Sequence, residues 1–208
     1  SLMAGYQNDL YNYDQSGPGS FSALLDRVEH RITANLRAQL RPDTTGILGY
    51  QYRIVNYTSD DSLTFGSPLD PEVRNSDSHY LYAGVDHSFT PELVGSLRAG
   101  AQFTSYDNVA PGEDDSTTNP YIDANLSYTY AKGSSVAIGL RHERNQTDIA
   151  QVGGSLILDQ ETTSVYASVT HQLSAKLSAN FVGMYANSSF GDSLVDTSDD
   201  FWSFGVNL

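Results

Sequence analysis

The chain contains no cysteine, no long apolar run and few basic residues. Without cysteine it can form neither a disulfide nor a thiolate metal site. No stretch of about 18 apolar residues occurs, so a membrane-spanning helix is excluded. The 11 Lys and Arg residues are outnumbered by 25 Asp and Glu residues, and the formal net charge is −14. This shortage of bases argues against nucleic-acid binding, which requires a basic stripe.

Ten segments alternate between apolar and polar side chains, a period that predicts β-strands. Four short turns recur roughly every 45 residues and divide the chain into hairpin-sized units. Longer connections rich in Gly, Ser and Asp join the hairpins, so we expect an up-and-down meander. The predicted strands are 2–13, 27–40, 46–58, 78–89, 93–106, 120–130, 135–146, 161–173, 177–189 and 200–208.

The segment 27–40 also contains good helix formers, so a helix competes with a strand there. Its apolar side chains nevertheless recur at every second position, and β-branched Val, Ile and Thr are present. We therefore predict a strand.

The two faces of the predicted strands differ in chemistry. One face carries mainly aliphatic and aromatic residues, and the other carries small and polar residues, several glycines and most of the strand charges. Alternation alone fits an apolar interior or an apolar exterior. Charges within the strands and strand lengths of about ten residues or more favour an apolar exterior. The sequence thus predicts an all-β fold, an antiparallel up-and-down transmembrane β-barrel of about ten strands, as a single domain of residues 1–208.

Charge is unevenly distributed along the chain. The long connections contain most of the acidic residues. Arg74 is the one basic residue that they contain. An acidic rim suits divalent cations, although solvated loop acids are the simpler interpretation. The 14 tyrosines, mostly near strand ends, suit a membrane interface because each combines an apolar ring with a polar hydroxyl.

Two hairpins resemble each other in sequence. GVDHSFTPELVGSLRAG at 84–100 aligns with SVTHQLSAKLSANFVGM at 168–184, so that His87 matches His171. In this pattern of hairpins the chain resembles bacterial outer-membrane β-barrel proteins, in particular porin-like barrels. The resemblance extends over almost the whole chain. The resemblance implies periplasmic short turns, extracellular long loops, a surrounding of outer-membrane lipid or lipopolysaccharide, and insertion by the barrel-assembly machinery.

Barrels of that kind usually end in an assembly signal. Ser203, Gly205 and Leu208 match three of its positions, but its terminal aromatic residue is missing. This difference suggests a trimmed end or a piece of a larger barrel. We expect residues 2–8 to pair with 201–208 and close a ten-stranded barrel, because an unpaired strand edge is not tolerated in lipid.

Charged residues on the polar face are candidates for an ion-pair ladder inside the barrel. Hairpin geometry places Asp86 near Arg98, and Asp123 opposite Arg141 with Glu143 two residues further on. Paired charges would plug the interior, whereas separated charges would line a selective pore. The further members, on the strands at 27–40 and 46–58, are Glu29, Arg31, Arg37 and Arg53.

No catalytic constellation is recognisable. The His-x-Ser motif of outer-membrane phospholipases has its closest counterpart in His142-Glu143-Arg144, where Arg cannot be the nucleophile. The other histidines lack an activated serine with an orienting carboxylate. Weak metal-ligand candidates in one loop lack the spacing of a calcium site, so we expect neither metal nor cofactor. These candidates are Asp107, Glu113, Asp114 and Asp115.

We therefore expect a non-enzymatic outer-membrane barrel that acts as a passive pore or as a structural element of the envelope. Two alternatives remain open on sequence grounds. One is a surface adhesion or recognition barrel that acts through its acidic loops. The other is a soluble barrel that binds a hydrophobic ligand in an apolar interior.

Overall fold

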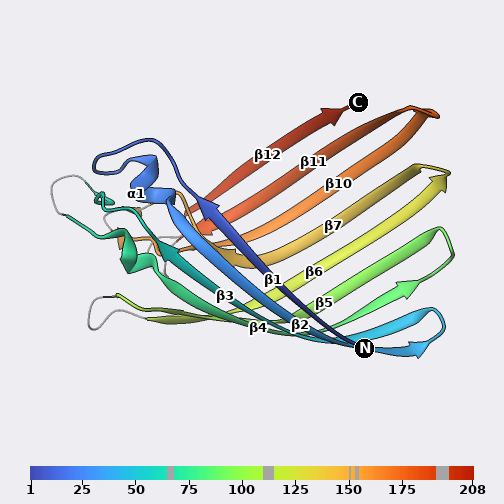
Figure 1. Cartoon of the computed structure of the whole chain (residues 1–208), viewed down its shortest axis with the longest axis horizontal. Helices are drawn as coiled ribbons and strands as arrows, with labels where there is room; N and C mark the ends of the chain where they lie inside the picture. Colours follow the sequence, from blue (N-terminus) through green and yellow to red (C-terminus); the bar gives the residue numbers. More distant parts are fainter. Residues whose placement is uncertain (65–67, 110–114, 150, 153–154, 191–196) are drawn as a thin grey trace.

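The computed structural model in Figure 1 describes residues 1–208 except 65–67, 110–114, 150, 153–154 and 191–196. Ten strands form one sheet, and each is antiparallel to the strand that precedes it in the sheet. The prediction of an all-β, up-and-down meander is therefore confirmed. The strands are, in sheet order, β1 (Leu2–Tyr11), β2 (Arg27–Arg41), β3 (Thr44–Tyr57), β4 (Ser76–Ser88), β5 (Leu93–Tyr106), β6 (Ser116–Ala131), β7 (Ser134–Asn145), β10 (Gln160–Ser174), β11 (Leu177–Phe190) and β12 (Thr197–Asn207).

Three smaller elements lie in the long connections. The helix α1 (Phe21–Leu25) begins after Ser20, whose hydroxyl accepts a hydrogen bond from the Ala23 amide at 3.1 Å. Sequence periodicity did not predict this helix, which ends just before β2. A 3-10 turn, η1 (Pro71–Arg74), precedes β4, and a short ribbon pairs β8 (Gln151–Val152) with β9 (Ser155–Leu156). No helix in the described ranges is long and apolar enough to cross a membrane.

The sheet curls into an open trough rather than a closed barrel (Figure 1). The strand β1 pairs only with β2, and β12 pairs only with β11. The expected ladder between residues 2–8 and 201–208 is absent, so the prediction that these ten strands close on themselves is wrong for this structure. Alternation within each strand specifies which face is apolar, but the same alternation fits an open or a closed sheet.

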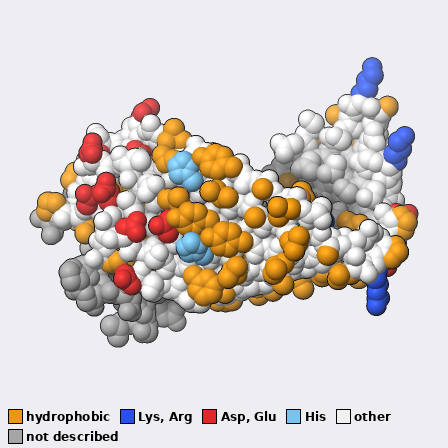
Figure 2. Space-filling model, turned by 60° about the horizontal axis from the view of Figure 1, so that its bottom comes forward, with side chains coloured by type: hydrophobic (Ala, Val, Ile, Leu, Met, Phe, Trp, Pro, Cys, Tyr) orange, Lys and Arg blue, Asp and Glu red, His pale blue; other side chains and the backbone are white. Residues whose placement is uncertain are grey.

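The two ends of the trough differ. The tight turns after β2, β4, β6 and β10 lie at one end, and both chain termini lie there as well (Figure 1). The long connections with α1 and η1 lie at the opposite end. We refer to these as the turn end and the loop end. Acidic side chains gather at the loop end, whereas Lys and Arg side chains project from the turn end (Figure 2).

The convex face of the sheet is apolar. Leu48 is 62% exposed, and Trp202 and Phe204 are likewise exposed on β12. The concave face is polar, because Glu29 and Arg53 are buried there and side chains of β3 reach the end of β7 across it. The assignment of apolar residues to the outer face of the sheet is therefore correct for this structure. Figure 2 shows the hydrophobic side chains as a band between the loop end and the turn end.

Two tyrosines on the concave face each lie over a glycine of the neighbouring strand. The Tyr82 hydroxyl donates to Asn35 Oδ1 at 2.8 Å and crosses β3 at Gly49. A Cβ atom at Gly49 would overlap the Tyr82 ring and lie 2.6 Å from Asn35 Oδ1. The same arrangement recurs in the second half of the sheet, where the Tyr166 hydroxyl accepts from Asn125 Nδ2 at 3.0 Å across Gly139. These glycines are needed because only hydrogen fits beneath the rings.

Candidate functional site

The middle of the concave face carries a chain of ion pairs. The Asp86 carboxylate on β4 lies 2.6 Å from Arg37 on β2 and 3.3 Å from Arg98 on β5. The Asp86 carboxylate therefore joins β2 to β5, which are not neighbours, and the Arg37 side chain must reach across β3. Hairpin geometry predicted the approach of Asp86 to Arg98, but the contribution of Arg37 depends on the curvature of the sheet.

A second group of charges continues this chain on β6 and β7. Asp123 lies directly opposite Arg98 in the β5–β6 register and opposite Arg141 in the β6–β7 register. The Arg141 guanidinium lies 2.5 Å from Asp123 and 3.7 Å from Glu143. Because the Arg141 side chain is 47% exposed, water screens these pairs and each adds little to stability.

Towards the loop end, a carboxylate is buried between two guanidinium groups. Glu29 accepts from Arg27 Nε at 2.8 Å and from Arg53 Nη2 at 2.6 Å. Removal of either arginine would leave a buried charge with fewer partners, which is costly in a region of low dielectric. Arg31 lies opposite Arg53 in the β2–β3 register, and it has no ion pair within the described part of the chain.

The end of β7 and the first residue after it make contacts across the concave face. Arg53 on β3 donates to Asn145 Oδ1 at 3.2 Å and to Gln146 Oε1 at 2.5 Å, although three strands separate β3 from β7. The Gln102 side chain on β5 donates to the Arg144 carbonyl at 3.1 Å and accepts from the Arg144 amide at 2.9 Å. These contacts narrow the trough at the loop end.

The same constriction is anchored where the connection returns to β10. The Tyr106 hydroxyl donates to Asp159, and Arg144 Nη1 lies 2.6 Å from Asp159 Oδ1. Asn119 on β6 donates to Glu161 at 2.8 Å. Ion pairs and hydrogen bonds from β5, β6 and β7 thus hold both ends of this connection against the sheet.

Arg74 is a structural residue that sequence reasoning did not single out. Its side chain is only 1% exposed and donates to the carbonyls of Leu24 and Thr147, so it joins η1 to α1 and to the connection after β7. The guanidinium also lies 4.7 Å from the centre of the Tyr57 ring. Burial lowers the pKa of the Arg74 guanidinium. Its position as the single base in the long connections was the signal in the sequence.

Three histidines on the convex face pair with tyrosine hydroxyl groups, two of them on the neighbouring strand and one on the strand beyond it. Nδ1 of His30 lies 2.9 Å from the Tyr6 hydroxyl, and Nδ1 of His79 lies 2.7 Å from the Tyr50 hydroxyl, both towards the loop end. Near the turn end, Nδ1 of His171 lies 2.9 Å from the Tyr130 hydroxyl. Histidine side chains border the apolar band in Figure 2. This pairing was not predicted from the sequence.

Two histidines on one strand give a length scale for the apolar band, whose side chains lie between and around them. His79 and His87 both lie on the convex face of β4, eight residues apart. At about 3.3 Å per residue this is roughly 26 Å along the strand, or about 20 Å after a strand tilt near 40°. That height is comparable to the apolar band of about 25 Å on known membrane barrels.

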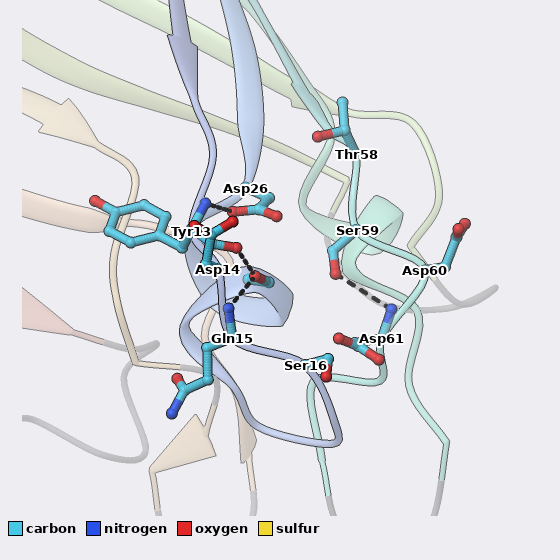
Figure 3. A pocket seen from close by; sticks show the side chains of 10 residues that line it. Tyr13, Asp14, Gln15, Ser16, Asp26, Thr58, Ser59, Asp60 and Asp61 are labelled. Carbon is cyan, nitrogen blue, oxygen red and sulfur yellow. Dashed lines mark hydrogen bonds between the residues drawn. The ribbon is translucent and has the colours of Figure 1, made fainter.

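An open pocket at the loop end is lined by four aspartates. It has a volume of about 610 Å³ and lies between the β1–α1 connection and the segment after β3. In Figure 3, Asp26 accepts from the Tyr13 amide at 2.8 Å, while the Asp61 amide donates to Ser59 at 3.2 Å. No group of three or more His, Cys, Asp or Glu in the described ranges is arranged to hold a metal ion. The four aspartates are Asp14, Asp26, Asp60 and Asp61.

Of the four weak metal candidates of the sequence, only Asp107 and Asp115 lie within the described residues. Asp107 donates its amide to the Asn75 carbonyl at 3.2 Å, and the Asp115 carbonyl accepts from the Tyr106 amide at 2.8 Å. Glu113 and Asp114 lie outside the described residues. The described pair therefore contributes backbone groups to the loop end.

Comparison with known proteins agrees with this architecture. A family model described as "putative beta-barrel porin 2" matches residues 26–208. The chain belongs to this porin-like β-barrel family. The match begins at the end of α1 and covers β2 to β12, so it includes every charged residue of the concave face described above. No curated protein and no solved structure matches the chain.

Proposed function

We propose that the chain forms the wall of a non-enzymatic outer-membrane barrel that passes small polar solutes by diffusion. The observation that carries this proposal is the division of one sheet into an apolar convex face and a charged concave face. A convex face of Leu, Phe and Trp suits lipid, and a concave face of ion pairs suits water. A soluble barrel with a hydrophobic ligand would require the opposite arrangement.

The orientation of the chain in the membrane is inferred from other outer-membrane barrels, which have short periplasmic turns and long extracellular loops. The short turns and both termini face the periplasm, and the acidic loop end faces the outside. Lipopolysaccharide then surrounds the loop end, where divalent cations can bridge its phosphates to the acidic rim. Insertion would use the barrel-assembly machinery, as in other outer-membrane barrels.

The contacts of Arg53 suggest where diffusion is limited. Its hydrogen bonds to Asn145 and Gln146 join β3 to the end of β7 and the start of the β7–β10 connection at the loop end. The ion pairs in the middle of the concave face lie further from the loop end and line the same diffusion path. The loop-end constriction therefore sets the size limit of the pore, and the ion-pair ladder sets its charge preference.

Single-channel conductance in planar bilayers tests this function. Because the sheet is open in this structure, conduction requires that the edges of β1 and β12 pair in the membrane, with each other or with another copy of the chain. The refolded chain should then give discrete conductance steps, and Asn145→Ser with Gln146→Ser should enlarge them because this segment loses its hydrogen bonds to Arg53. Asn108→Ser is the matched control, since this amide donates to the Glu72 carbonyl at the exposed rim. A folded, inserted chain without any conductance would refute the pore and favour a structural role in the envelope.

A further inference from the structure

Two neighbouring hairpins at one corner of the turn end contain no acidic residues of their own, and the nearest acidic turn residue is Glu92, whose carbonyl accepts from the Thr129 amide at 2.8 Å. The hairpin segments 124–140 and 162–190 contain no Asp or Glu, although the chain has 25 acids in all. Their bases are Lys132, His171 and Lys176. The other two turns differ, because Arg41 is accompanied by Asp43, and the turn after β4 carries Glu92 without a base.

The two lysine-bearing turns lie side by side. The strand β7 pairs with β10 down to Ser135 opposite Thr170, which places the β6–β7 and β10–β11 turns next to each other. The Gln172 amide donates to Ser134 Oγ at 3.0 Å. Gly133 has a φ of 72° and packs so closely on the Gln172 side chain that a Cβ atom would overlap it. The corner is therefore a fixed surface rather than two independent turns.

The corner borders the apolar convex face. Tyr130 and His171 are hydrogen-bonded at 2.9 Å, and their rings lie nearly parallel with centroids 6.0 Å apart. Leu173 and Leu177 are exposed beside them. Lys132 and Lys176 are exposed in the turns themselves, and neither forms an ion pair with any described residue. Exposed apolar side chains thus lie beside two turns whose ammonium groups form no ion pair with any described residue.

We propose that this corner binds the phosphate of an anionic phospholipid through Lys132 and Lys176, with the acyl chains against Leu173 and Leu177. The proposal rests on the proposed membrane function. Charge complementarity supports it, because the corner is cationic in a chain of net charge −14. Its position at the edge of the apolar band matches the depth at which phosphates lie in a leaflet. Tyr130 and His171 supply the interfacial rings beside the headgroup.

Competition between two lipids, read by native mass spectrometry, tests the proposal. The chain is refolded into vesicles of equal phosphatidylglycerol and phosphatidylcholine, released in detergent, and the retained lipids are counted. Wild type should retain phosphatidylglycerol preferentially. Lys132→Gln and Lys176→Gln should each reduce that preference roughly five-fold, since one base near a membrane surface contributes about that factor. Arg41→Gln removes a base outside the corner and should leave the preference unchanged.

Further measurements distinguish failure of the lipid site from failure of the membrane function. Addition of soluble glycerol 3-phosphate should not displace the lipid, because the acyl chains contribute to binding, and complete displacement would overturn the assignment to a lipid. Equal retention of both lipids by a chain that inserts and conducts would refute the headgroup site and leave the barrel function intact. Failure to insert into either lipid would instead refute the membrane function on which the site depends.

Discussion

Substitution of Gly49 by alanine should destabilise the sheet strongly. The added methyl group would overlap the Tyr82 ring and lie 2.6 Å from Asn35 Oδ1. Tyr82 is 7% exposed and packs against Tyr121 at a ring separation of 5.5 Å, so it has little room to move away. Displacing the ring also breaks the hydrogen bond between Tyr82 and Asn35.

The expected loss of stability is the sum of two contributions. Overpacking of a buried site costs about 1–3 kcal/mol, and loss of a buried hydrogen bond costs about 1 kcal/mol. Gly49→Ala should therefore lower the free energy of unfolding by about 2–4 kcal/mol. Gly183→Ala is the matched control, because the nearest atom to its added methyl would be 3.5 Å away in Phe204. Relief of glycine flexibility should make that change neutral or stabilising by up to about 1 kcal/mol.

Urea unfolding in lipid vesicles measures both variants, and the single tryptophan, Trp202, gives a unique fluorescence signal. In a Tyr82→Ala background, Gly49→Ala should cost less than in the wild type, because the smaller side chain removes the overlap. Equal effects of Gly49→Ala and Gly183→Ala would refute the argument that the ring over Gly49 requires a glycine there.

Three other predictions follow from the two faces and their contacts. Leu126→Arg should lower the stability of the inserted chain by about 2–4 kcal/mol, and Ser127→Arg on the opposite face should have a smaller effect; equal urea midpoints would contradict an apolar exterior. A double-mutant cycle with Asp123→Ala and Arg141→Ala should give a coupling energy of about 0.5–1 kcal/mol, whereas zero coupling would show that their contact at 2.5 Å does not stabilise the folded chain. Arg74→Ala should cost about 2–4 kcal/mol because two carbonyl groups lose a buried donor, and protease cleavage near α1 should become faster; an unchanged cleavage rate would show that Arg74 does not hold the loop end.

Local side-chain patterns in the sequence determined much of this protein. The period of two in segments such as 27–40 specified strands, because successive side chains of a strand point to opposite faces. The same period placed Leu48 and Arg53 on opposite faces, and the charges within the strands favoured the assignment of the apolar face to the outside. Short turns of fixed spacing specified the up-and-down order, since antiparallel neighbours need only a few linking residues. The pairing of Asp123 with Arg141 followed from the hairpin register alone.

Only the tertiary structure decided the contacts between strands that are not neighbours. Arg53 reaches Gln146 because the sheet curves, and no local pattern encodes the degree of curvature. Curvature likewise decided that Arg37 reaches Asp86 and that the Tyr82 hydroxyl reaches Asn35. Arg74 acquires its carbonyl partners from two other connections, whose packing depends on the whole loop end. The open edges of β1 and β12 also arise at this level, because strand alternation is the same in an open and a closed sheet.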